Sequence, residues 1–169
     1  MVLLQIAEPG AGPESNTQRK VAVGIDLGTT NSLIAHFDGA SLQVLQDGSG
    51  SLSLPSVVYF GARDVRIGQA AMAQASAEPA NTIASAKRML GRARGEFEDD
   101  PYVTLAPGDT LAFATDAGAK TPVEVAAAIL VALRERGEQQ LDAPISGAVI
   151  TVPAYFDDAQ RQATRQAAE

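Results

Sequence analysis

The stretch GIDLGTTNS (24–32) carries the residues with the most specific chemistry in this sequence. An apolar run ends at Asp26, and Gly28, Thr29 and Thr30 then turn the chain before the next apolar run. We expect a positive φ at Gly28, turn amides that converge on an anion, and two threonine hydroxyls as further donors. A carboxylate beside such amides suits Mg²⁺, which prefers oxygen ligands. The pattern therefore predicts a site for the phosphates and metal of a nucleotide.

The same residues also fit an ordinary Asp-Gly-Thr hairpin turn. Such short motifs arise freely, so the first four residues alone favour this plainer interpretation. The longer stretch through Asn31 and Ser32 shifts the balance considerably towards phosphate binding. No GxxxxGK[ST] sequence occurs in the chain, and a strand-to-strand turn replaces a strand-to-helix turn. A P-loop is therefore excluded.

Lys87, in NTIASAKRMLGR (81–92), is the second candidate for chemistry. On a helix packed near the turn, its ammonium would reach a γ-phosphate and stabilise charge that develops during phosphoryl transfer. The alternative is a solvated Lys-Arg pair near a helix C-terminus, and spacing alone favours that alternative. The single histidine, His36, lies mid-strand without a partner for metal binding. Four acidic residues predict only an exposed loop: Glu96, Glu98, Asp99 and Asp100.

Composition excludes several classes of function. The 13 Lys and Arg against 20 Asp and Glu give a net charge of −7, which argues against non-specific nucleic-acid binding. The absence of cysteine removes disulfides, thiolate metal sites and thiol nucleophiles. No uncharged run approaches a membrane span, and the opening MVLLQIAEPG lacks a basic signal-peptide region. We expect a soluble, cytoplasmic protein that does not bind membranes or nucleic acid.

The elements that would position these residues begin after a Pro/Gly/Ser-rich leader (1–19), which we expect to be flexible. Apolar and alternating runs then predict a meander of strands before any helix. Asp38-Gly39 is a hairpin signal between the second and third strands, and the first strand is expected to be buried. The predicted strands are VAVGIDL (21–27), SLIAHF (32–37), SLQVLQ (41–46) and SVVYF (56–60).

Helical patterns follow at 68–76 and 81–91, and Asn81 and Gly91 suit the start and stop of the second. Between them and the next helix lie strand-like pieces at 102–105 and 110–115.

The best-marked helix starts at Thr121, where Pro122 at the first helical position and Glu124 three residues after Thr121 form a capping box. Its apolar face repeats every four residues at Val125, Ile129 and Leu133.

GAVITVP (147–153) predicts a second buried strand, and Asp157 is the expected N-cap of a final helix. The helical pattern continues to Glu169 without Gly, Pro or another stop signal. We therefore expect the chain to be truncated inside this helix.

Three stretches occur here in the order found in one known family: GIDLGTTNS, NTIASAKRMLGR and VITVPAYFDDAQRQAT (149–164). Over most of residues 20–169 the chain resembles the ATPase domain of the seventy-kilodalton heat-shock chaperones, the DnaK-type family. The third stretch is too long to match by chance. The opening MVLLQIAEPG and the variant FDDAQRQ resemble the HscA-type branch, which serves iron–sulfur cluster assembly.

The resemblance implies roles for the residues of the first two motifs. Asp26 matches the family's metal-coordinating aspartate, and Lys87 matches its catalytic lysine, which reverses the preference stated above. The first phosphate motif is matched by Gly28, Thr29, Thr30 and Asn31.

The third motif implies a relay between nucleotide and substrate domain. Pro153 matches the proline switch that responds to nucleotide state. Arg161 matches the arginine through which that switch communicates with the substrate domain, and Tyr155 lies in the same relay region.

The resemblance also implies a fold: an α/β, actin-like ATPase fold, of which residues 20–169 form an incomplete first lobe. A mixed sheet begun by an antiparallel hairpin meander would carry packed helices. The implied cofactors are ATP or ADP and Mg²⁺, and the implied partners are a J-domain co-chaperone and an iron–sulfur scaffold client protein. The second phosphate motif, the adenosine-binding segment and the peptide-binding domain would follow Glu169. We therefore expect the chain alone to bind Mg·ATP weakly or not at all.

Two other classes of protein share this superfold. A sugar kinase also carries a Gly-Thr-Thr turn after an aspartate, although Asn31 and the 149–164 stretch argue against it. A non-catalytic, actin-like scaffold protein would use the fold structurally. Sugar phosphorylation would support the first alternative, and nucleotide-dependent polymerisation would support the second.

Overall fold

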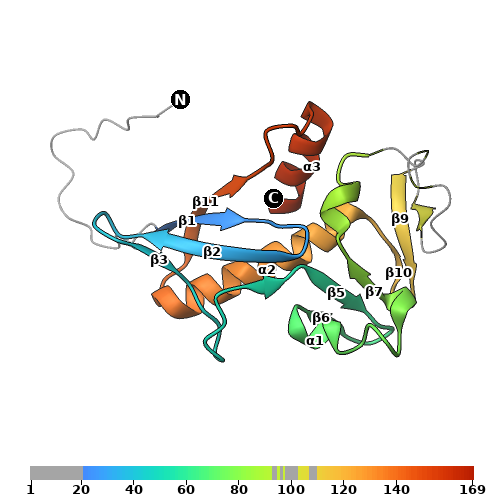
Figure 1. The fold of residues 1–169 in the computed structure, drawn as a ribbon, viewed down its shortest axis with the longest axis horizontal. Coiled ribbons are helices and arrows are strands. Elements are labelled where there is room, and N and C mark those ends of the chain that lie inside the picture. Colours follow the sequence, from blue (N-terminus) through green and yellow to red (C-terminus); the bar gives the residue numbers. More distant parts are fainter. Residues whose placement is uncertain (1–20, 93–94, 96, 98–102, 107–109) are drawn as a thin grey trace, which may run out of the picture.

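A mixed sheet with strand order β11-β1-β2-β3 organises the fold (Figure 1). β1 (Val21–Asp26) pairs antiparallel with β2 (Asn31–Phe37), β2 pairs antiparallel with β3 (Leu42–Val44), and β1 pairs parallel with β11 (Ile145–Thr151). The hairpin meander and the mixed sheet are thus confirmed.

This computed structural model describes residues 21–92, 95, 97, 103–106 and 110–169. The predicted leader and the four clustered acidic residues lie outside the described residues.

Only one face of β1 is buried. Val21, Val23 and Ile25 are buried, whereas the residues that alternate with them are exposed. The strand therefore has the period-two pattern of a sheet covered on one side, and the prediction of a fully buried strand is wrong for its other face.

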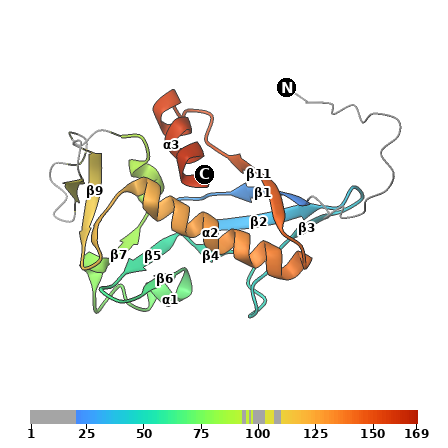
Figure 2. The ribbon, with the colours of Figure 1, turned by 180° about the vertical axis from the view of Figure 1, so that it is seen from behind.

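Helix α2 (Pro122–Leu141) covers that buried face and runs along the sheet (Figure 2). A Cβ at Gly137 would lie 2.7 Å from the Cδ1 atom of Ile145 and 2.9 Å from that of Ile34. The absence of a side chain at this position lets the helix approach the sheet closely.

The described residues form two further, three-stranded sheets, with orders β6-β5-β7 and β10-β9-β8, which lie at the same end of the first sheet (Figure 1). The predicted strands at 56–60 and 110–115 are confirmed, and residues 103–105 of the predicted piece at 102–105 lie in β8. Four short strands (β4, β6, β7 and β10) were not predicted. The bounds are β4 Leu54–Pro55, β5 Val57–Phe60, β6 Val65–Ile67, β7 Thr82–Ala84, β8 Val103–Ala106, β9 Thr110–Thr115 and β10 Gly118–Lys120.

The predicted helix at 81–91 is wrong. The chain forms a 3₁₀ turn, η1 (Pro79–Asn81), then strand β7, then a second 3₁₀ turn, η2 (Ala86–Met89). Ile83 pairs with Val58 of β5 and is buried, so tertiary packing overrides the helical pattern. Ser85, at φ 59°, then interrupts any regular element. The other predicted helix, at 68–76, is reduced to α1 (Gln69–Met72).

The two capping predictions are confirmed. In α2 the Thr121 hydroxyl accepts from the amide of Glu124, whose carboxylate accepts from the Thr121 amide at 2.7 Å. Val125, Ile129 and Leu133 all face the core. Helix α3 (Asp158–Ala168) begins with an analogous box between Asp157 and Gln160. Within the part of the chain that the structure describes, no helix is long and apolar enough to cross a bilayer.

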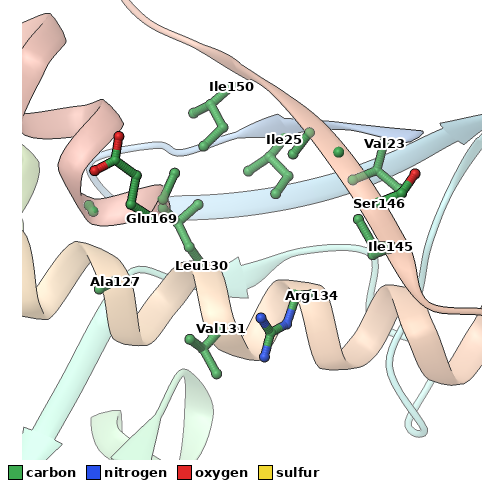
Figure 3. Close-up of a pocket in the computed structure, with 14 residues that line it drawn as sticks. Val23, Ile25, Ala127, Leu130, Val131, Arg134, Ile145, Ser146, Ile150 and Glu169 are labelled. Carbon is green, nitrogen blue, oxygen red and sulfur yellow. The ribbon is translucent and has the colours of Figure 1, made fainter. Parts of the chain in front are cut away.

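β11 is largely exposed, contrary to the prediction of a buried strand at 147–153. Val149 exposes 72% of its surface. Among the described strands β11 is outermost in its sheet, and residues of β11, β1, α2 and the end of α3 line an open cavity of about 360 Å³ (Figure 3). Its apolar residues therefore lack the two covering layers that a buried parallel strand has.

The turn between β2 and β3 has an acid-sensitive carboxylate. The amides of Ser41 and Ala40 donate to Asp38 at 2.8 Å and, with the Ser41 hydroxyl, lower the pKa of Asp38 from 3.8 to about 2. A carboxylate whose pKa is lower in the folded state than in the unfolded state stabilises the fold at pH values above its unfolded-state pKa. This stabilisation disappears as the pH falls through the folded-state pKa. We expect the Ser41 amide resonance to titrate with a midpoint near 2 in NMR spectra. A midpoint near 3.8, as in an unstructured peptide, would show that these hydrogen bonds do not form.

Candidate functional site

The turn between β1 and β2 is held at both ends by hydrogen bonds. The Gly28 amide donates to the Ser32 hydroxyl at 3.1 Å, and the Ser56 amide donates to the Thr30 carbonyl at 2.8 Å. Within the described residues, the amides of Thr29 and Thr30 have no hydrogen-bond partner. Two backbone donors are thus left at the top of an anchored turn, which suits binding of an anion.

Gly28 does not adopt the predicted positive φ. The structure gives another reason for glycine here, because a Cβ at this position would overlap the carbonyl oxygen of Asn31. The close approach of the two backbone segments is therefore what excludes a side chain. The Gly28 amide is also occupied by Ser32, so the convergence of amides is limited to those of Thr29 and Thr30.

Asp26 lies at the carboxyl end of β1 and is exposed beside this turn. The parallel register places it opposite Thr151 of β11, whose hydroxyl donates to Asp26 Oδ1 at 2.9 Å. This bond orients the carboxylate and connects it to the strand that leads into Pro153. No group of three or more His, Asp or Glu side chains suited to a metal is found among the described residues.

Lys87 lies in η2 and is half-buried, whereas its neighbour Arg88 is exposed. Burial lowers the pKa of Lys87, and the nearby charge of Asp26 opposes that effect. Its Nζ atom lies 5.6 Å from the centroid of the Phe156 ring. Arg88 is thus solvated, as the plainer interpretation expects, whereas Lys87 is partly buried between Asp26 and the Phe156 ring.

The segment from Pro153 to Phe156 forms a tight turn before α3. The Phe156 amide donates to the Pro153 carbonyl at 3.1 Å. Arg161, one turn into the helix, donates through Nε to the Phe156 carbonyl at 3.1 Å and through Nη2 to the Ala154 carbonyl at 3.3 Å. Tyr155 is 80% exposed, with its ring edge-on to that of Phe156. Arg161 therefore ties the turn directly to the helix.

The segment that carries Lys87 also packs closely on the start of α3. Gly91 has φ +67°, and a Cβ there would lie 2.6 Å from the amide nitrogen of Gln160. Only glycine fits this contact without strain. The structure thus brings the three sequence motifs together, with η2 between the β1–β2 turn and the turn at 153–156.

Three residues of this arrangement were missed from the sequence: Ser32, Ser56 and Thr151. A signal existed for Ser32, because it precedes Ile34 by two residues and so occupies a core-facing position of β2. A polar residue at such a position requires a hydrogen-bond partner. Ser56 and Thr151 gave no comparable local signal, since their partners are distant in sequence.

Comparison with known proteins decides the family. The sequence model described as Hsp70 protein matches residues 22–169, which is most of the chain. The chain belongs to the Hsp70 family. The α/β, actin-like ATPase fold predicted from the sequence accords with this membership and with the mixed sheet and packed helices of the structure.

Curated relatives that share about half of their aligned residues with this chain agree with this assignment. The chain is 51% identical over 175 residues to the chaperone protein HscA homolog of Acidovorax ebreus and 52% identical over 174 residues to that of Burkholderia multivorans. The HscA homolog of Methylobacillus flagellatus is 51% identical over 172 residues. In each case the match covers 99% of this Hsp70-family chain and 28% of the relative. These names agree with the predicted HscA-type branch.

Proposed function

We propose that this chain is part of the first ATPase lobe of an HscA-type, ATP-dependent chaperone, and that the β1–β2 turn binds the terminal phosphates of ATP or ADP with Mg²⁺. The observation that carries the proposal is the convergence of three distant motifs. Thr151 bonds to Asp26 at 2.9 Å, and Lys87 lies near both Asp26 and the Phe156 ring. An incidental hairpin turn would not bring a half-buried lysine and a carboxylate together.

The residues at the turn fit a nucleotide with its metal. The amides of Thr29 and Thr30 would donate to phosphate oxygens, with Asn31 at the end of the same motif. The exposed carboxylate of Asp26, already oriented through its Oδ1 atom, would hold Mg²⁺ directly or through water. When bound, this metal neutralises charge on the phosphates during transfer.

Lys87 is the proposed catalytic residue. Its ammonium would orient the attacking water and stabilise charge that develops on the γ-phosphoryl group. Partial burial favours this role, because a charge in a less polar environment acts more strongly on a neighbouring charge. The nearby Asp26 carboxylate favours the protonated form, which is the form that the role requires.

Pro153, Tyr155 and Arg161 form the proposed relay to a substrate domain. Movement of β11, through the Asp26–Thr151 bond, would reach Pro153 two residues later. The two hydrogen bonds from Arg161 would then transmit the displacement to α3. The exposed ring of Tyr155 would be free to contact a further domain. Such a linkage requires that nucleotide binding favour one of two arrangements of this turn.

The proposed partners are a J-domain co-chaperone and an iron–sulfur scaffold client, with no role for nucleic acid or membranes. The domain boundary at residue 20 and the cytoplasmic location stay predictions.

To test the function, ATP hydrolysis by the full-length protein is measured with and without both partners. We expect the two together to stimulate turnover. Sugar-dependent phosphoryl transfer would instead identify a kinase, and nucleotide-dependent polymerisation without stimulated turnover would identify a scaffold.

A further inference from the structure

A pair of buried serine hydroxyls lies directly beneath the β1–β2 turn. Ser32 and Ser56 have exposed fractions of 0% and 3%, and their Oγ atoms are 2.8 Å apart. Ser32 belongs to β2, which pairs with β4 beside the turn, and Ser56 is the residue that directly follows β4. Two hydroxyls in a position otherwise filled by apolar side chains need a reason beyond packing.

The hydroxyl pair is connected to both ends of the turn. Ser32 Oγ accepts the Gly28 amide at 3.1 Å, which holds the first residue of the turn. The Ser56 amide donates to the Thr30 carbonyl at 2.8 Å, which holds the last. The hydroxyl–hydroxyl bond joins these two anchors into one network. Thr29 and Thr30, whose amides face no partner among the described residues, are thereby fixed between the anchors.

Ser32 also determines where the Gly28 amide points. Without its hydroxyl, that amide would have no acceptor in the turn and would compete with those of Thr29 and Thr30 for the same anion or for water. The geometry of an anion site depends on donors that are already oriented before the ligand arrives.

We propose that Ser32 and Ser56 are positioning residues that hold the phosphate-binding turn in its binding geometry, with Ser32 acting on the Gly28 amide and Ser56 acting through Ser32. The inference rests on the proposed function for its ligand, although the positioning itself is a property of the nucleotide-free protein. Both side chains are buried, so neither would contact a bound phosphate. Their effect is therefore on affinity for nucleotide and not on the chemical step.

The test uses Ser32→Ala in the full-length protein. We expect Mg·ADP and Mg·ATP to bind about tenfold more weakly, since one hydrogen bond that orders the turn is lost. Turnover at saturating ATP should change by less than about threefold, because Lys87 is untouched. Ser32→Thr, which retains a hydroxyl, should restore affinity to within about threefold of the parent protein. A general loss of stability would lower both nucleotide affinity and turnover, and would not lower affinity alone.

Further variants keep the test decisive if Ser32→Ala does not fold. Ser56→Ala leaves the Gly28–Ser32 bond in place and should weaken binding by about threefold. Where both single variants fold, the double variant should be no weaker than Ser32→Ala, because both residues act through one bond. The matched control is Ser146→Ala. The Ser146 hydroxyl donates to the Val21 carbonyl at 3.0 Å, at the end of β1 that lies away from the turn. Its loss should leave the affinity for nucleotide unchanged.

Amide hydrogen exchange of the nucleotide-free protein provides a second readout. Peptides that contain Gly28 should exchange about tenfold faster in Ser32→Ala and at the parent rate in Ser146→Ala. If the parent protein binds no Mg·ATP, the proposed function is wrong, and the exchange result still decides the positioning role. If the parent protein binds nucleotide, and Ser32→Ala shows parental affinity and exchange, the positioning role is wrong and the proposed function stands.

Discussion

Lys87→Ala in the full-length protein is expected to lower ATP turnover by about 10²- to 10³-fold, which is typical for loss of a group that stabilises transition-state charge. The dissociation constant for Mg·ATP should change by less than about threefold, because the turn amides and Asp26 remain. The reason lies in the position of Lys87, half-buried between Asp26 and the Phe156 ring. Single-turnover hydrolysis and equilibrium binding measure the two quantities separately.

Two further variants separate chemistry from packing. Lys87→Met retains an unbranched side chain beside Phe156 but no charge, so its turnover should be as low as that of Lys87→Ala. Arg88→Ala removes the neighbouring, exposed cation and should leave turnover unchanged. Parental turnover in Lys87→Met would contradict a catalytic role. An equal loss in Arg88→Ala would show that only the local positive charge matters.

Gly28→Ala is expected to weaken Mg·ATP binding by at least about 100-fold, because a displaced turn loses the orientation of both phosphate-facing amides. A methyl group at this position would overlap the Asn31 carbonyl oxygen, so the backbone of the turn must move. Forced overlap of this kind also costs about 1–3 kcal/mol of folding stability. Isothermal calorimetry and thermal unfolding measure the two effects.

The chain offers a matched control four residues earlier. A Cβ at Gly24, in β1, would meet nothing within 4 Å. Gly24→Ala makes the same chemical change in the strand that leads to the turn, and it should leave nucleotide affinity unchanged. Equal losses in the two variants would mean that the effect comes from the strand and not from close approach at Gly28.

The elements that the sequence predicted correctly are those fixed by local chemistry. The capping boxes at Thr121 and Asp157 depend on residues three positions apart, and the four-residue repeat of α2 needs no information from elsewhere. The same holds for the turn at Asp38, whose side chain bonds to amides two and three residues later. Local bonds of this kind survive in the folded protein because tertiary packing does not compete with them.

The errors occurred where distant partners decide the structure. Residues 81–91 have a helical pattern, yet Ile83 gains more by pairing with Val58 in the core, and a strand with 3₁₀ turns results. β11 resembles β1 in composition, but its exposure depends on which layers cover it. At Gly28 the need for glycine was predicted and its cause was not, because the carbonyl of Asn31 becomes a neighbour only after the turn has formed.

The sequence alone identified some residues of the candidate site and not others. The motif at 24–32 indicated phosphate chemistry by itself. Lys87 was a candidate from the sequence, but spacing favoured a solvated pair, and only family resemblance favoured its catalytic role and supplied the relay role of Pro153. Their proximity to Asp26 and its strand could not be derived from spacing, since about sixty residues separate Lys87 from each of the other two motifs. The structure supplies that proximity through the β1–β11 register and the packing of Gly91 on α3.

The central claim is that the amides of Thr29 and Thr30 bind the terminal phosphates of a nucleotide while Asp26 holds its metal. A crystal structure of the full-length protein with Mg²⁺ and a non-hydrolysable ATP analogue tests it most directly. We expect both amides to donate to phosphate oxygens, with the Asp26 carboxylate bound to Mg²⁺ directly or through one water. A nucleotide bound elsewhere, with these amides turned away from it and Asp26 remote from the metal, would contradict the account.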